Sequence, residues 1–131
     1  MSAPTFHNYA TMEKKSEEFH YSQSTIVNGI IKTSGQGGWD AEGVITSDPK
    51  KQVEFAFENV VKALDAAKKG ASWKDVYAVR SYHTNIDESA EYVIELFNNY
   101  MPDHRPIWTC VEISKLGIEG MQVEIEVEAQ A

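Results

Sequence analysis

The stretch that decides the fold is residues 121–129, which read MQVEIEVEA. From position 123 onward apolar and acidic residues alternate, and a period of two is typical of a β-strand with one buried face. Val123, Ile125 and Val127 therefore face a core, and the three glutamates beside them face the other way. Three acids on one face fit water or a polar interface and not a dry core. We expect a sheet covered by helices on one face, with its other face wet or held against another chain.

A β-hairpin precedes this strand in the sequence. Residues 21–27 alternate, residues 30–34 return, and Asn28-Gly29 between them is typical of a type I′ turn, which needs positive φ at both central positions. Residues 6–9 predict an edge strand, and the charged residues 13–18 predict a loop. A glycine-rich loop follows the hairpin.

Two helices are predicted. Asp48 can cap the first and Pro49 suits its first turn, and the helix should end near Lys69-Gly70. The second covers about residues 87–100, because its apolar residues recur at helical spacing and Pro102 forbids continuation.

Strands at residues 75–83 and 106–113 complete the order β-β-β-α-β-α-β-β. Two helices against one sheet form an α+β two-layer domain. The chain has 131 residues and no linker-like segment, so residues 1–131 should form a single domain.

Composition excludes several classes of protein. The net charge is -8, with 12 basic and 20 acidic residues, which disfavours nucleic-acid binding and a basic membrane-surface helix. No apolar run is long enough for a transmembrane helix, and the N-terminus matches neither a signal nor a transit peptide. A single cysteine, Cys110, allows no intrachain disulfide, and the four histidines lack metal-ligand spacing. We expect a cytoplasmic protein without a bound metal.

Several segments together carry a resemblance to a known family. Tyr21-x-Gln23 is followed by Ser34-Gly35-Gln36, then by Thr109-Cys110-Val111-Glu112 with Lys115-Leu116 behind it, and last by Val123-Glu124-Ile125-Glu126. In this order and spacing the chain resembles the RidA/YjgF family, whose older name is the L-PSP endoribonuclease family. The resemblance covers roughly residues 21–129.

The resemblance implies a chorismate-mutase-like protomer, a homotrimer whose sheets form a central barrel, and small-molecule clefts between subunits. Many members hydrolyse reactive enamines and imines, such as 2-aminoacrylate and 2-iminobutanoate, to 2-keto acids and ammonia. They use no metal and no cofactor.

The family's site residues carry over at five positions. Glu124 matches the acid, which such chemistry needs to position or deprotonate water. Ser34 and Gly35 match the loop whose backbone donors hold polar atoms. Tyr21 matches the tyrosine that lines the cleft, and Cys110 matches the cysteine two residues after the family's arginine.

At that arginine the chain departs from the family, because Trp108 stands there. A bidentate Arg–carboxylate contact is worth about 2–4 kcal/mol of binding free energy. Without the arginine, the carboxylate of an imino acid loses this contact. Trp108 offers instead a flat apolar surface for an aromatic or less charged ligand. Arg105 lies three residues before Trp108. Because this separation is odd, we expect the Arg105 side chain to point to the opposite face of the strand. Arg80 is either a replacement clamp or the partner of a strand acid such as Glu124 or Glu126.

The chain therefore resembles an arginine-lacking branch of the family, and three functions stay open. One is an imine or enamine deaminase with Arg80 or Arg105 facing the cleft. Another is a small-molecule-binding or regulatory trimer without turnover. The third, the ribonuclease of the older name, is disfavoured by the charge of -8.

Overall fold

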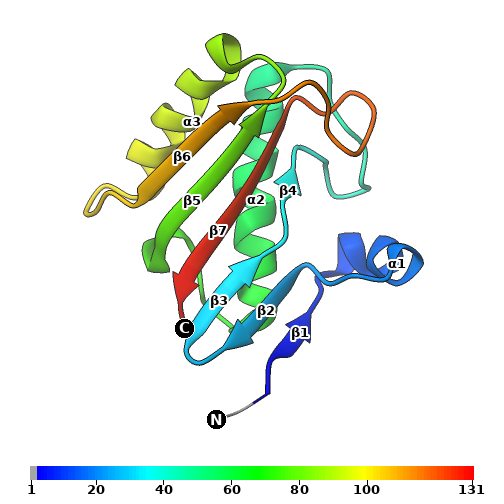
Figure 1. Cartoon of the computed structure of the whole chain (residues 1–131), viewed down its shortest axis with the longest axis vertical. Helices are drawn as coiled ribbons and strands as arrows, with labels where there is room; N and C mark the ends of the chain where they lie inside the picture. The colour runs from blue at the N-terminus through cyan, green and yellow to red at the C-terminus, as the bar shows by residue number, and fades with distance from the viewer. Residues whose placement is uncertain (1–2) are drawn as a thin grey trace.

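The computed structural model describes residues 3–131 and shows one mixed sheet with helices beside it (Figure 1). The strands are β1 (Thr5–His7), β2 (Ser24–Val27), β3 (Ile30–Thr33), β4 (Gln36–Gly37), β5 (Val76–His83), β6 (Ile107–Glu112) and β7 (Val123–Gln130). The helices are α1 (Ala10–Phe19), α2 (Pro49–Ala67), the short 3-10 helix η1 (Trp73–Asp75) and α3 (Ile86–Tyr100).

Strand β7, the last in the sequence, lies in the middle of the sheet. The order across the sheet is β1-β2-β3-β7-β5-β6, with β4 also paired to β7. Strands β5 and β6 are parallel and are joined through α3, whereas the other pairs are antiparallel. Strands β1 and β6 therefore form the two edges.

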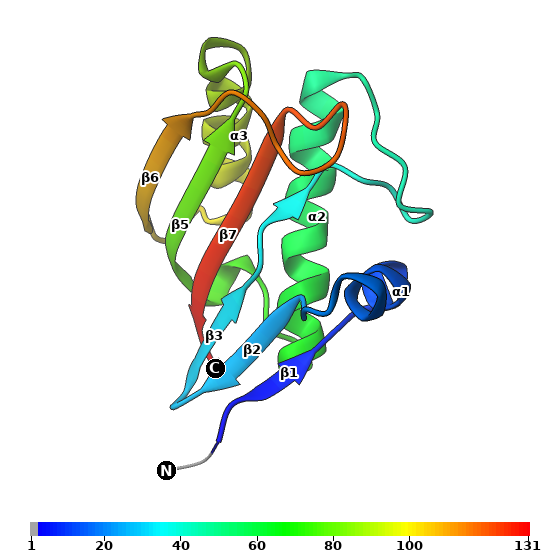
Figure 2. The same ribbon diagram turned by 45° about the vertical axis from the view of Figure 1, so that its right-hand side comes forward.

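The two faces of the sheet differ as the alternation in β7 predicts. Val123, Ile125 and Val127 are at most 1% exposed and pack in the core under α2 and α3, which cover this face (Figure 2). We call it the helix face. Glu124 and Glu126 lie on the opposite face, which no helix of residues 3–131 covers, and we call that the open face. The α+β two-layer prediction is confirmed.

The local signals of the hairpin and of α2 are also confirmed. Asn28 and Gly29 have φ of 51° and 77°, as a type I′ turn requires. The Asp48 side chain accepts from the backbone N–H of Lys50 and Lys51, and Pro49 opens the helix.

The predicted loop at residues 13–18 is wrong, because these residues lie in α1. The helix buries only Met12 and Ser16, so it lacks the apolar stripe that would reveal it in the sequence. Packing holds it instead: Met12 lies in a second apolar cluster with Trp39, and Ser16 Oγ accepts from Gln23 Nε2 at 3.0 Å. The predicted glycine loop likewise contains the short strand β4.

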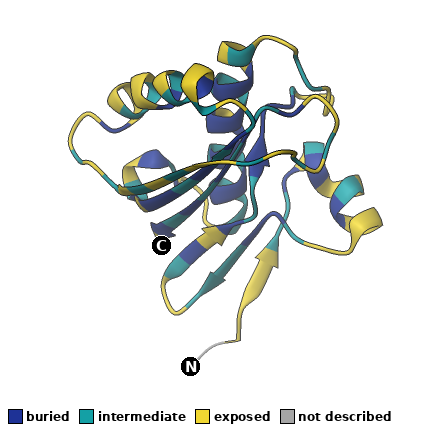
Figure 3. Cartoon of the chain, turned by 45° about the horizontal axis from the view of Figure 1, so that its top comes forward, coloured by how far each residue is buried: buried dark blue, intermediate teal, exposed yellow. Residues whose placement is uncertain are grey.

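The solvent exposure of the residues agrees with the two-layer architecture (Figure 3). The strands of the centre are largely buried, while β1 and the outward turns of α3 are exposed. Within residues 3–131 no helix combines the length and the hydropathy that crossing a bilayer requires.

Candidate functional site

The Ser34–Gly35 turn lies directly against Glu124. Strand β3 pairs with β7 up to Glu128, and β4 resumes the pairing at Ile125, so the chain leaves the ladder between them. A Cβ added to Gly35 would lie 1.8 Å from Glu124 Oε1, so the carboxyl group packs onto the Gly35 backbone. Two predicted site elements are therefore in contact within one chain.

Hydrogen bonds fix the shape of this turn. The Ser34 hydroxyl donates to the Ser22 carbonyl at 2.7 Å, and the Ser34 N–H donates to the Gln23 carbonyl at 2.8 Å. The buried Gln36 amide donates to Gln23 Oε1 at 2.9 Å and to the Ser34 carbonyl at 3.1 Å. These bonds hold the turn rigidly beneath Glu124.

Glu124 is in an environment that favours its neutral form. Burial raises the pKa of its carboxyl group, and the nearby charge of Glu126 raises it further. A carboxyl group with a raised pKa can both give and take a proton nearer neutral pH. Among the residues predicted for the site, Glu124 is the one with the chemistry of a general acid–base.

Tyr21 lies on the same side of the protein as Ser34. The two line a pocket of about 480 Å³, which also contacts Phe6 and Lys32. The Tyr21 side chain is 41% exposed, so it is open to a ligand or to a second chain.

Trp108 lies on the helix face. It pairs with Val79 of β5, and its ring packs edge-to-face on Phe97 of α3, with centroids 5.1 Å apart. Its indole Nε1 donates to Ser81 Oγ at 2.9 Å. The Trp108 side chain is thus held on two sides.

Cys110 shares that face, because it is two residues farther along β6 and pairs with Ser81. Glu124 pairs with Tyr82, and Trp108 pairs with Val79, three residues away on β5. An odd separation on one strand means opposite faces. Within one chain, Glu124 and the pair Trp108–Cys110 therefore point to opposite sides of the sheet.

Arg80 lies on the open face and is already paired. Its Nε and Nη1 reach Glu126 Oε1 and Glu128 Oε2, each at 3.1 Å. The Tyr82 hydroxyl also donates to Glu126, and Lys32 lies 3.6 Å from Glu128. Of the two readings of Arg80, the arrangement favours the strand ion pair over a free anion clamp.

Sequence reasoning missed a buried network behind Trp108. His83 is fully buried, with Nε2 at 2.8 Å from Ser81 Oγ and Nδ1 at 2.5 Å from Ser89 Oγ. Ser89 donates onward to the Asn85 carbonyl, so Nδ1 must carry the proton and Nε2 must accept from Ser81. Burial lowers the pKa of His83. Polar residues at 81 and 83, on the apolar face of β5, were the available signal.

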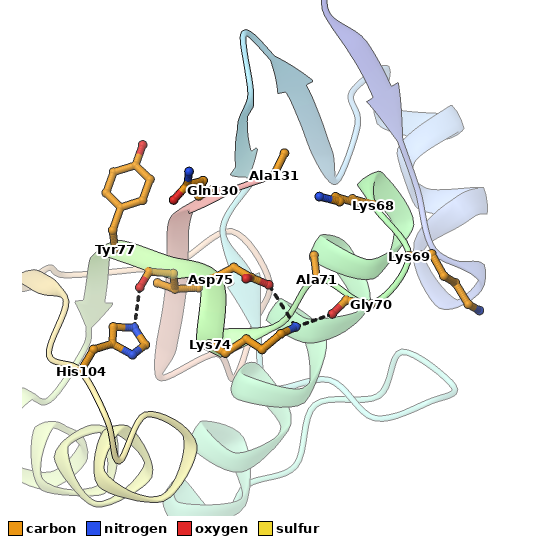
Figure 4. A pocket seen from close by; sticks show the side chains of 11 residues that line it. Lys68, Lys69, Gly70, Ala71, Lys74, Asp75, Tyr77, His104, Gln130 and Ala131 are labelled. Atoms are coloured by element: carbon orange, nitrogen blue, oxygen red, sulfur yellow. Dashed lines mark hydrogen bonds and ion pairs between the residues drawn. The ribbon is translucent and has the colours of Figure 1, made fainter.

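A larger pocket, of about 520 Å³, lies at the end of α2 and holds none of the predicted site residues (Figure 4). Of its lysines, Lys74 is bonded to Asp75 at 3.3 Å and to the Gly70 carbonyl at 2.8 Å. Within residues 3–131, no three His, Cys, Asp or Glu side chains gather closely enough to hold a metal ion.

Comparison with known proteins identifies the family of this chain. The sequence pattern described as endoribonuclease L-PSP matches residues 12–131. The chain belongs to this family, RidA/YjgF/L-PSP. Escherichia coli YjgH, a RutC family protein, is 31% identical over 114 residues, covering 86% of this chain and 84% of YjgH. A RutC family protein of Aquifex aeolicus is 33% identical over 112 residues, covering 83% and 86%.

Solved structures of the family share the fold. The structure of a YjgH protein superposes with a TM-score of 0.85 at 28% identity, covering 98% of this chain and 97% of that one. The structure of Escherichia coli TdcF with bound serine gives a TM-score of 0.74 at 25% identity, covering 85% and 87%.

Proposed function

We propose that this member of the RidA/YjgF/L-PSP family is a cofactor-free hydrolase that converts imines or enamines to carbonyl compounds and ammonia. The observation that carries the proposal is the contact between the Glu124 carboxyl group and the Gly35 backbone, together with the raised pKa of Glu124. This pairs a proton-transfer group with a turn whose backbone can bind polar atoms.

The chemistry needs one such group. Glu124 takes a proton from water as the water oxygen bonds to the imine carbon, and it returns that proton to the imine nitrogen, which gives the neutral carbinolamine. Glu124 then takes the proton of the carbinolamine hydroxyl as the C=O bond forms and gives it to the nitrogen, whose bond to carbon breaks so that it leaves as ammonia. Positioned acid–base catalysis of this kind typically accelerates a reaction by about 10²–10⁴-fold.

We further propose that the site is completed between subunits of a homotrimer. Glu124 and Trp108 point to opposite faces of one sheet, so a cleft that contains both needs two chains. Strand β6 favours such assembly, because it is an edge strand on which Ile107 is 72% exposed and Val111 is 37% exposed. Sedimentation should give three times the 14.7 kDa chain mass, and a monomer would contradict the inter-subunit site.

The test of turnover is hydrolysis of 2-iminobutanoate made in situ by a threonine dehydratase, with semicarbazide trapping the imine that remains. The wild type should shorten the life of the imine. The hydrolysis rate of Glu124→Gln should be at least about tenfold lower than that of the wild type, because the substitution removes the proton-transfer group. Glu119→Gln, an exposed acid in the loop before β7, is the matched control and should keep full activity. Equal activity of Glu124→Gln and wild type would refute the role of Glu124.

The alternative of a ligand-binding trimer without turnover is favoured by Trp108. An indole bonded to Ser81 cannot form the bidentate contact that an arginine gives an imino-acid carboxylate. If the wild type shows no imine hydrolysis but retains saturable ligand binding, this alternative replaces the first.

A ribonuclease is the least supported function. The open face carries Glu124, Glu126 and Glu128 in a chain with net charge -8, which repels a phosphate backbone.

A further inference from the structure

A small pocket lies between the C-terminal half of α3 and the start of β6. Its volume is about 260 Å³, below that of drug-sized sites and suited to a small ligand. Ile94, Phe97 and Trp108 supply apolar walls, and Asn98, His104 and Arg105 are among its polar residues. The prediction that Arg105 points away from Trp108 is wrong, because Arg105 precedes β6, which begins at Ile107, so the alternation of the strand does not reach it. Within one chain this pocket lies on the helix face, whereas Glu124 lies on the open face.

The pocket has a fixed apolar wall. The Trp108 ring is held by the hydrogen bond to Ser81 and by the edge-to-face contact with Phe97 at an interplanar angle of 82°. A ring fixed in this way binds a planar or branched apolar body without losing further side-chain freedom.

The polar residues leave one positive charge for a ligand. His104 Nε2 donates to the Val76 carbonyl, and the Asn98 amide donates to the Ile94 carbonyl, at 2.8 and 2.9 Å. Among residues 3–131, Arg105 is in no ion pair, whereas Arg80 is in two. No Asp or Glu lines this pocket, although the chain carries 20 of them.

We infer that the Arg105–Trp108 pocket binds a small aromatic or branched carboxylate, with the carboxylate on Arg105 and the apolar body against Trp108. A guanidinium beside an apolar wall complements a ligand that has both a carboxylate and an apolar body. A neutral ligand of the same shape lacks the charge-assisted contact. The inference does not require turnover at Glu124, so a ligand-binding trimer and an enzyme would both show it.

The test compares phenylacetate with its neutral isostere phenylacetamide by titration calorimetry of the full chain. Phenylacetate should bind at least about tenfold more tightly, because a charge-assisted contact to arginine exceeds a neutral one. The indole N–H resonance of Trp108 should shift during the titration, which places the ligand in this pocket. Equal affinities, or saturation without a shift at Trp108, would overturn the inference.

Two variants sharpen the result. Arg105→Gln should reduce phenylacetate affinity to that of phenylacetamide. Lys51→Gln removes the same charge from an exposed position of α2 and should bind as the wild type does. Equal losses in both variants would mean that only net charge matters, and would overturn the inference. The imine assay has a separate readout, so failure of either proposal is recognised independently.

Discussion

The Trp108 indole donates its N–H to Ser81 Oγ across the pairing of β6 with β5. The Ser81 hydroxyl in turn forms a hydrogen bond with His83 Nε2 at 2.8 Å, so the edge strand is tied to a buried histidine through one hydroxyl. Trp108, which the sequence resemblance aligns with the family's arginine, is thus part of the core hydrogen-bonding of the helix face.

Removing that hydroxyl should be costly. Ser81→Ala leaves both the Trp108 N–H and His83 Nε2 without their partner in a buried setting, so the free energy of unfolding should fall by about 1–3 kcal/mol. Urea unfolding measures it, with the exposed Ser114→Ala as control. Combining Ser81→Ala with Trp108→Phe should cost less than the sum of the single changes. Strict additivity would mean that the bond contributes nothing.

His83 should make stability depend on pH. Its folded pKa is lowered by burial, while the unfolded value is near 6.5. Between those values the unfolded chain binds more protons, so the free energy of unfolding should fall as pH drops from about 7 through 6.5 and below. His83→Gln should remove this part of the slope in urea titrations at several pH values, and His7→Gln should keep it. Parallel slopes for wild type and His83→Gln would contradict the burial of a neutral imidazole.

Glu124 should act in the opposite sense. Its folded pKa is raised above the ordinary value of 4.5, so its neutral form stabilises the fold at low pH and this contribution is lost as pH rises through the folded pKa. Glu124→Gln should therefore be more thermostable than wild type at pH 8, with a difference that shrinks toward pH 4. A lower Tm of Glu124→Gln at pH 8 would show that the carboxylate is stabilised rather than strained in the fold.

Two nearby glycines should respond differently to alanine. A Cβ at Gly35 meets the end of the flexible Glu124 side chain, which can move, so Gly35→Ala should displace the carboxyl group at a cost below about 1 kcal/mol. A Cβ at Gly38 meets the α2 backbone at Gln52, 2.5 Å from its Cα, so Gly38→Ala should cost about 1–3 kcal/mol or more. Thermal unfolding measures both changes.

Imine hydrolysis tests whether the contact between Gly35 and Glu124 matters for activity. Gly35→Ala should lose activity while remaining folded, because the proton-transfer group has moved. Retained activity in folded Gly35→Ala would show that the position of the Glu124 carboxyl group over the turn is unimportant.

Much of the fold was readable from local signals. The alternation in residues 123–129, the Asn28-Gly29 turn and the Asp48-Pro49 helix start each fix backbone geometry within a few residues, and each is confirmed. Helix α1 was not readable, because its burial rests on one methionine and a serine that bonds to a distant glutamine.

The surroundings of the candidate site were predictable in part. The resemblance named Ser34, Gly35 and Glu124 together, and Gly35 and Glu124 are in contact, since β4 resumes the pairing with β7 there. That these residues form a functional site stays a prediction. The bonds of Trp108 to Ser81 and of Arg80 to Glu128 depend on strand register, which no local pattern specifies.

The place of β7 between β3 and β5 has a consequence for synthesis on the ribosome. Both neighbours emerge at least about 40 residues before it, so the nascent chain must carry two unpaired strand edges while α2, α3 and β6 form. Chains interrupted before residue 123 keep these edges open and should be taken up by chaperones or proteases. The protein therefore completes its sheet only after most of it has been translated, and its yield in the cell depends on how well those edges are shielded until then.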